Sequence, residues 1–213
     1  HRIPKTQALE TLDEHFRRTG RRVYLSSELP VYYPGESVFA PDLIAVLDVP
    51  SHARQKWVVS QEGKGLDVVL EIHVGGSRQK DFELNVGRFA RLGIPEYFVF
   101  DPGRRRLLGH RLGAPGTYDA IMPQGGRWAS RVLGLDLALE GSRLRFYYGA
   151  GPLPDARELL ERVSAMVDDA TARAEREAER AAREGERAVR EGERAERLAA
   201  KLRELGVDPD SSD

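Results

Sequence analysis

The chain of 213 residues is long enough for one ordinary domain with an appended segment, and its hydrophobic content of 40% supports a packed core. No cysteine is present, which excludes a disulfide framework and a thiolate zinc site, so we expect a cytoplasmic protein. No apolar run approaches the roughly 20 residues that span a bilayer. The opening stretch HRIPKTQALE has no basic-plus-apolar leader, so we expect neither secretion nor a membrane anchor.

The net charge of −1 hides an asymmetry between the two parts of the chain. Residues 155–213 hold 12 basic and 17 acidic side chains, a net charge of −5, so the preceding residues carry +4. A mildly basic body is compatible with a phosphate-bearing partner. It lacks the strongly basic composition that identifies a nucleic-acid binder from charge alone.

The first half of the chain reads as one helix followed by short strands. The spacing of Leu9, Leu12 and Phe16 predicts a helix from Lys5 to about Arg18, with Thr6 as its N-cap. Two short strands are expected within residues 21–37 and one in the apolar run at 38–50, whereas residues 51–66 are polar and read as a loop.

The stretch DVVLEIHVGGSRQKDFELNVGRFARLGIPEYFVFDP, residues 67–102, predicts a strand, a helix and a second strand. Phe82, Val86 and Phe89 recur on one helical face, and Gly93 follows where a helix is expected to end. Further strands are predicted in residues 107–113, 116–123 and 143–149. This order indicates an α/β or α+β domain whose sheet is covered by helices.

The composition changes near residue 153, which predicts a domain over residues 1–152, a long Ala/Arg/Glu-rich helix over 153–206 and a disordered tail over 207–213. REGERAV at 183–189 is repeated as REGERAE at 190–196. Small or apolar side chains recur every seven residues, which is coiled-coil periodicity. The alternatives are a weak dimerisation helix and a solvated helix that pairs with nothing.

Two carboxylates occur on consecutive predicted strands, Asp42 at the start of one and Glu71 in the middle of the next. Carboxylates that meet at neighbouring strands can hold Mg²⁺, which prefers oxygen ligands and water. His73 follows two residues after Glu71 and is expected on the same face. This set suits metal-assisted phosphodiester hydrolysis. The alternative is that both acids are satisfied by arginine or backbone groups.

The pieces FAPDLIAV, DVVLEI and KDFELNVGRFARLGIPEYFVFDP, in this order and spacing, resemble the Uma2 family (DUF820) of the PD-(D/E)xK restriction-endonuclease-like superfamily. The resemblance runs from about residue 1 to Tyr148. It implies a restriction-endonuclease-like core, with a four-stranded mixed sheet flanked by helices, and DNA as the substrate. It also implies that Asp42 and Glu71 bind the metal, Mg²⁺ or Mn²⁺.

The lysine that the resemblance leads us to expect is missing from both of its usual places. The superfamily pattern puts it at His73, and sequences like Uma2 put it at Asn85, four residues after Asp81. Either His73 replaces the lysine, since histidine takes up a proton near neutral pH, or Lys80 reaches in from the helix start. The third alternative is an impaired site.

Three functions therefore stay open: a Mg²⁺-dependent DNA endonuclease, a non-catalytic binding module with the same fold, and an assembly protein that recruits partners through its tail. A nuclease that cuts both strands needs two active sites, which a two-fold dimer supplies. We therefore expect a homodimer.

Overall fold

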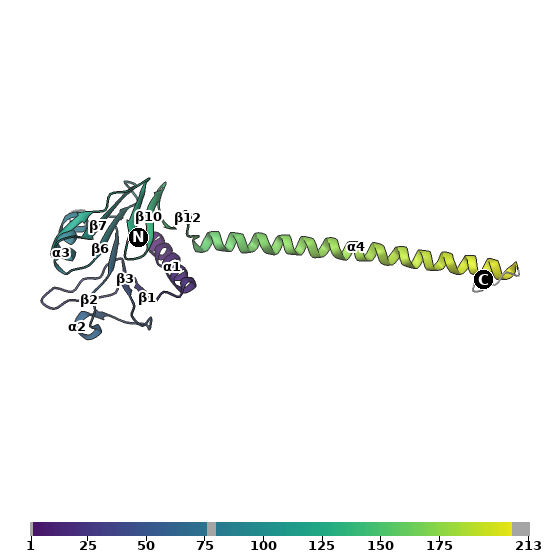
Figure 1. Cartoon of the computed structure of the whole chain (residues 1–213), viewed down its shortest axis with the longest axis horizontal. Helices are drawn as coiled ribbons and strands as arrows, with labels where there is room; N and C mark the ends of the chain where they lie inside the picture. Colours follow the sequence, from purple (N-terminus) through teal and green to yellow (C-terminus); the bar gives the residue numbers. More distant parts are fainter. Residues whose placement is uncertain (1, 76–79, 206–213) are drawn as a thin grey trace. The chain divides into compact units, whose positions relative to one another are not determined.

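Six strands form the main sheet of the protein in this computed structural model, which describes residues 2–75 and 80–205 (Figure 1). In sheet order they are β1 (Val23–Ser26), β3 (Leu43–Leu47), β5 (Val68–Ile72), β6 (Glu96–Asp101), β7 (Arg106–Leu112) and β8 (Tyr118–Ala120). Only β5 and β6 run parallel, so the sheet is mixed as expected. It has six strands rather than four, because β1 and β8 extend its two edges.

The parallel pair β5 and β6 is joined by a helical crossover, as parallel neighbours require. The described part of the crossover begins with a π-helical turn, η1 (Lys80–Leu84), and continues as α3 (Asn85–Arg91). Gly93, at φ +73°, follows the helix where the sequence placed its end. A glycine takes this left-handed conformation at no steric cost, which explains the sharp stop.

A second sheet and a short strand pair complete the strands. Antiparallel β9 (Arg127–Ser130), β10 (Leu135–Glu140), β11 (Arg143–Tyr148) and β12 (Gly151–Pro152) form one sheet, and β2 (Val31–Tyr32) pairs in parallel with β4 (Trp57–Val58). The sequence reading missed β9 and β10. It was also wrong for residues 51–66, where β4 and α2 (Val59–Glu62) interrupt the loop, because the buried Trp57 anchors the strand.

The two faces of the main sheet carry separate cores. On one face, helix α1 (Arg2–Thr19) and the second sheet pack against the strands, and Leu12 and Phe16 of α1 are buried as predicted. On the other face lie α3 and the β2–β4 pair, where Phe89 and Trp57 are buried. Thr6 does not cap α1, because the helix already begins at Arg2.

The long helix α4 (Ala156–Glu204) begins at a reciprocal cap. The Glu158 N–H donates to Asp155 Oδ1 at 2.9 Å, and the Asp155 N–H donates to Glu158 Oε2 at 3.0 Å. Arg145 of β11 also donates to Glu158 and lies 3.7 Å from Asp155 Oδ2. These contacts form a capping box held by a buried arginine.

The chain divides into two compact units, residues 1–158 and 159–213. No side chain of α4 is buried among the described residues of the chain. The predicted boundaries at residue 152 and the predicted coiled coil stay predictions, and residues 207–213 lie outside the described part. No helix between residues 2–75 or 80–205 is both long and apolar enough to cross a membrane.

Candidate functional site

Asp42 and Glu71 lie opposite each other on neighbouring antiparallel strands. Leu43 pairs with Leu70 and Ile44 with Val69, so the next position of the register places Asp42 beside Glu71. Side chains alternate between the faces of a strand. Ile44 and Val69 pack in the core on the α3 side of the sheet, so both acids face that side as well. The two carboxylates that the sequence proposed as partners thus meet.

Backbone hydrogen bonds hold the two acids in a reciprocal arrangement. The Asp42 N–H donates to Glu71 Oε2 at 3.2 Å, and the Ile72 N–H donates to Asp42 Oδ2 at 2.8 Å. These bonds, from backbone to side chain, lie just beyond the last regular pair of the β3–β5 ladder. One oxygen of each carboxylate is therefore fixed by the strand backbone, which keeps the pair in place.

Glu71 is strongly destabilised as an anion. Its side chain is buried, and burial, followed by the negative charge of Asp42, raises its pKa to about 8. A side-chain hydrogen bond with Asp42 and the charge of Asp81 contribute in the same direction. Among residues 2–75 and 80–205, no lysine or arginine forms an ion pair with Glu71. The described chain therefore supplies no lysine or arginine to balance a negative charge on the buried Glu71 carboxylate.

His73 lies directly after β5, and an aspartate that the sequence reading did not single out holds its ring. The His73 N–H donates to the Phe100 carbonyl at 2.7 Å, and Nδ1 lies 2.8 Å from Asp81 Oδ2. The ring also meets Phe82 edge to face, with centroids 5.7 Å apart. In the sequence analysis, Asp81 served only to locate the expected lysine position at Asn85. Its contact with His73, eight residues earlier, was not predicted.

Tyr97 and Asn85 close the site on the side of the helix. The Tyr97 hydroxyl donates to the Asp81 carbonyl at 2.7 Å. Burial, together with the negative charges of Glu71 and Asp81, raises the pKa of Tyr97 well above its usual value. Asn85 is 4% exposed, and its side chain lies against the Tyr97 hydroxyl, where it acts to lower that pKa.

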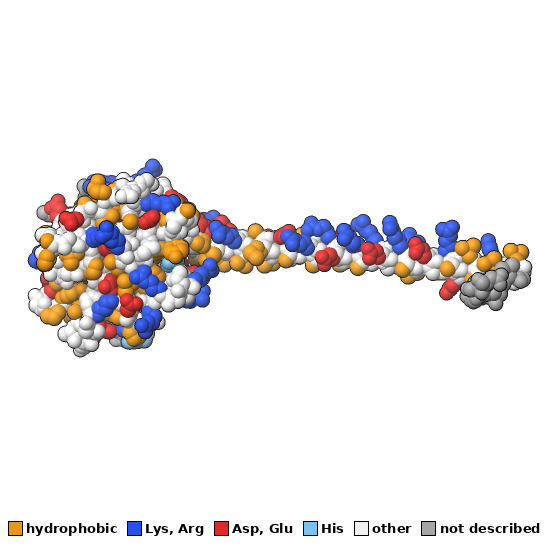
Figure 2. Space-filling model, in the orientation of Figure 1, with side chains coloured by type: hydrophobic (Ala, Val, Ile, Leu, Met, Phe, Trp, Pro, Cys, Tyr) orange, Lys and Arg blue, Asp and Glu red, His pale blue; other side chains and the backbone are white. Residues whose placement is uncertain are grey.

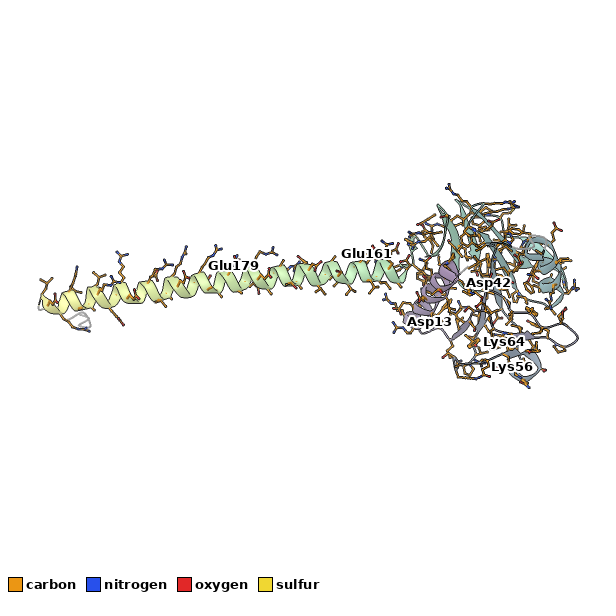
Figure 3. All side chains as sticks on the ribbon, turned by 180° about the vertical axis from the view of Figure 1, so that it is seen from behind. Asp13, Asp42, Lys56, Lys64, Glu161 and Glu179 are labelled. Atoms are coloured by element: carbon orange, nitrogen blue, oxygen red, sulfur yellow. The ribbon has the colours of Figure 1, made fainter. Side chains whose placement is uncertain are left out.

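The lysines whose ion pairs are described are engaged away from Asp42 and Glu71. The side chain of Lys80 lies outside the described part of the structure. Lys5 forms an ion pair with Glu28, and Lys64 pairs with Asp67 at 3.0 Å. Figure 3 shows Asp42 apart from Lys56 and Lys64. The histidine and the asparagine thus occupy the positions at which a lysine was expected, as the sequence indicated.

The acid pair fits a small hard cation better than a closed metal cage. Within the described ranges, no three His, Cys, Asp or Glu side chains come together to hold a metal ion. Mg²⁺ does not require such a cage, because it is commonly held by one or two carboxylates and keeps several waters. A cation would also offset the repulsion that raises the pKa of Glu71. The donor set of Asp42 and Glu71 therefore fits Mg²⁺ or Mn²⁺.

A second buried acid lies on the neighbouring strand in different surroundings. Glu96 is 0% exposed, yet Arg111 Nε donates to its Oε1 at 2.9 Å and the Arg131 N–H donates to the same oxygen at 2.9 Å. The Ser130 hydroxyl donates to Oε2 at 2.5 Å. These bonds join β6 to β7 and to the end of β9, so Glu96 links the two sheets.

Comparison with known proteins gives a family and a fold. The family model Uma2, described as "Putative restriction endonuclease", matches residues 1–144. A solved structure described as "a putative nuclease belonging to DUF820 from Anabaena variabilis ATCC 29413" is similar in fold, with a TM-score of 0.53. It shares 13% sequence identity, over 67% of this chain and 79% of that one. No curated protein matches the chain.

Proposed function

The chain belongs to the Uma2 family, and from this premise we propose that it is a Mg²⁺-dependent endonuclease that hydrolyses phosphodiester bonds in DNA. The observation that carries the proposal is the meeting of Asp42 and Glu71 on one face of the sheet, with Glu71 buried against a like charge. Strongly perturbed pKa values cluster at functional sites, where charged groups are held close together.

Asp42 and Glu71 would hold the cation, which supplies charge stabilisation at the phosphate and lowers the pKa of a bound water. Backbone bonds from Asp42 and Ile72 keep both carboxylates oriented before any ligand arrives. Such preorganisation avoids the cost of ordering the ligands on binding.

His73 is the group we propose as the base. An ionised Asp81 only accepts hydrogen bonds, so His73 Nδ1 carries the proton of the 2.8 Å contact and Nε2 is left as the acceptor. Asp81 thus positions the ring and selects the tautomer that can take a proton from water. Tyr97 in turn fixes Asp81 through its backbone carbonyl.

Cleavage of supercoiled plasmid in Mg²⁺ or Mn²⁺ tests the metal-binding acids. Asp42→Asn and Glu71→Gln each keep the shape of the side chain, and each should lower the rate about a thousandfold. Asp13→Asn, an exposed acid on α1, serves as the control and should cut like the wild type. Cleavage that survives both site substitutions would refute the assignment.

The group that replaces the lysine is tested in the same assay. His73→Ala should abolish cleavage while leaving the fold intact, and Lys80→Ala should have little effect. The opposite result would move the role to Lys80. Asn85→Lys restores a lysine where the family resemblance leads us to expect one, and should raise the rate about a hundredfold if a cation there assists the water.

A binding module without catalysis is the second candidate, and the buried Asn85 is the observation that favours it. An amide cannot neutralise a developing charge as a lysine ammonium does. Salt-dependent DNA binding without cleavage by the wild type, with cleavage gained in Asn85→Lys, would establish this alternative. Cleavage by the wild type would exclude it.

We further propose that the protein acts as a homodimer in the cytoplasm, with one site for each DNA strand. The mass of the full chain in solution, measured by light scattering, checks the first part. A monomer at the concentration that cuts both strands would contradict it.

A further inference from the structure

The basic side chains of α4 between residues 173 and 201 are completely segregated. From Arg173 to Lys201 the helix contains nine basic residues, and successive ones are three or four positions apart without exception. This spacing places all of them along one side of a helix. We call this set the basic stripe; it consists of Arg173, Arg176, Arg180, Arg183, Arg187, Arg190, Arg194, Arg197 and Lys201.

The acidic residues of the same segment all lie off the basic stripe, most of them on its two flanks. Figure 2 shows blue side chains in a row along one edge of α4, with red and orange side chains beside and below them. At 1.5 Å of rise per residue, the basic stripe is about 42 Å long. That length corresponds to about 12 base pairs of a DNA duplex, at 3.4 Å for each phosphate of one strand.

Ion pairing inside the helix accounts for only part of the basic stripe. Arg173, Arg183, Arg190 and Arg197 each pair with an acid four residues earlier, at 2.6 to 3.3 Å. The remaining five members of the basic stripe form no ion pair within the described chain. Each member also has a like charge three or four residues away, which destabilises an isolated helix. Helix stability alone would favour mixed charges along each side.

The chemistry of the basic stripe fits a polyanion rather than a protein surface. No apolar residue interrupts it between Arg173 and Lys201, whereas protein interfaces depend on a buried apolar or aromatic centre. Arginine forks bind phosphate oxygens in pairs, and contacts of this kind need no base sequence. The acidic flanks repel phosphate, so only one side of the helix can face it.

We propose that the basic stripe of α4 binds the phosphate backbone of double-stranded DNA without regard to sequence. The choice of DNA among polyanions rests on the proposed function. The stripe would raise the local concentration of substrate around the protein.

A charge-relocation variant of the full chain tests this proposal. Exchanging two members of the basic stripe with acids two residues later gives Arg173→Glu, Glu175→Arg, Arg194→Glu and Glu196→Arg in one protein. Each exchange moves an arginine about 200° around the helix, away from the basic stripe. Composition and net charge stay the same, and circular dichroism verifies that the variant keeps its helix. The control, Glu175→Gln with Glu196→Gln, removes the same two acids and leaves the basic stripe intact.

The measurement is binding to a fluorescent DNA duplex of about 30 base pairs in EDTA, over a range of salt concentrations. The relocated variant should bind at least about tenfold more weakly at 0.1 M salt, with a salt dependence shallower by about two. The control should bind as tightly as the wild type or more tightly.

Equal affinity and equal salt dependence of the relocated variant and the wild type would overturn the proposal. Displacement of DNA by polyglutamate at equal charge concentration would overturn the assignment to DNA. Because EDTA prevents metal-dependent cleavage, the result is independent of whether Asp42 and Glu71 support catalysis. If the wild type cleaves DNA and the relocated variant binds DNA as tightly as the wild type, the proposed function stands and only the DNA-binding role of the basic stripe is rejected.

Discussion

Two glutamates on adjacent parallel strands, Glu71 of β5 and Glu96 of β6, are both buried, but they meet opposite kinds of neighbour. Glu96 receives hydrogen bonds from Arg111, Ser130 and the Arg131 backbone, so its charge is balanced where it lies. Glu71 receives one long backbone bond and faces the carboxylate of Asp42.

The difference separates a structural acid from a site acid. A buried carboxylate with a cation and several donors is stable as an anion and holds elements together. A buried carboxylate beside another is unstable until a proton or a cation joins it. The chain contains both on the same sheet, so burial alone does not identify the site. The sign of the nearest charge does.

The largest expected effect is on stability, and it comes from removing the charge of Glu96, the glutamate that is paired with an arginine. Glu96→Gln should lower the free energy of unfolding by about 3 to 5 kcal/mol, because Arg111 loses its buried partner. Urea unfolding measures it. Glu71→Gln, measured beside it at pH 8 without metal, should not destabilise the protein. Equal losses in the two variants would show that both glutamates are structural.

The second prediction concerns the pH dependence of the metal-free protein. The pKa of Glu71 is about 8 in the folded state and 4.5 in the unfolded state, so between these values the folded state holds a proton that the unfolded state lacks. The stability from Glu71 is thus full below about pH 4.5 and is lost as the pH rises toward 8, a fall on the order of 2 to 3 kcal/mol. Glu71→Gln should remove this slope. An unchanged slope would assign it to other groups.

A smaller effect is expected from Mg²⁺. Binding to the folded state alone should stabilise the wild type by about 1.4 kcal/mol at ten times the dissociation constant. Thermal unfolding at pH 8 with and without Mg²⁺ measures the gain. Glu71→Gln and Asp42→Asn should lose it, and Glu96→Gln should keep it. A gain that persists in the two site variants would locate the ion elsewhere.

The smallest effect is expected from removing one of the hydrogen-bond donors to Glu96. Ser130→Ala removes the hydroxyl bonded to Glu96 and leaves Arg111 and the Arg131 N–H in place. We expect a loss of about 1 to 2 kcal/mol in urea unfolding, with plasmid cleavage unchanged. A change in cleavage greater than the change in stability would connect Glu96 to the site.

The sequence predicted the acid pair because strand alternation and order are local properties. Asp42 and Glu71 each lie in or next to an apolar run that predicts a strand. Only the pairing register of the two strands had to come from the structure. The family resemblance predicted the mixed sheet. It also led us to expect a lysine, at the positions that His73 and Asn85 occupy.

Asp81 could not be found in the same way, because its contact with His73 depends on how the crossover returns to the sheet. Strands β9 and β10 were missed for a related reason. Their residues gain burial only by packing against the main sheet and α1, and Leu135 and Leu137 alternate over a run too short to be distinctive.

The capping box at Asp155 and Glu158 has a consequence for how α4 forms. A helix loses the conformational entropy of its first turn before the first hydrogen bond forms. An exposed helix that contains two glycines has no burial of side chains to offset this loss. Here the costly first turn is already assembled on Arg145, inside the folded unit. Helix growth can therefore start from a fixed seed at residue 156 and spread outward, with fraying confined mainly to the distal end.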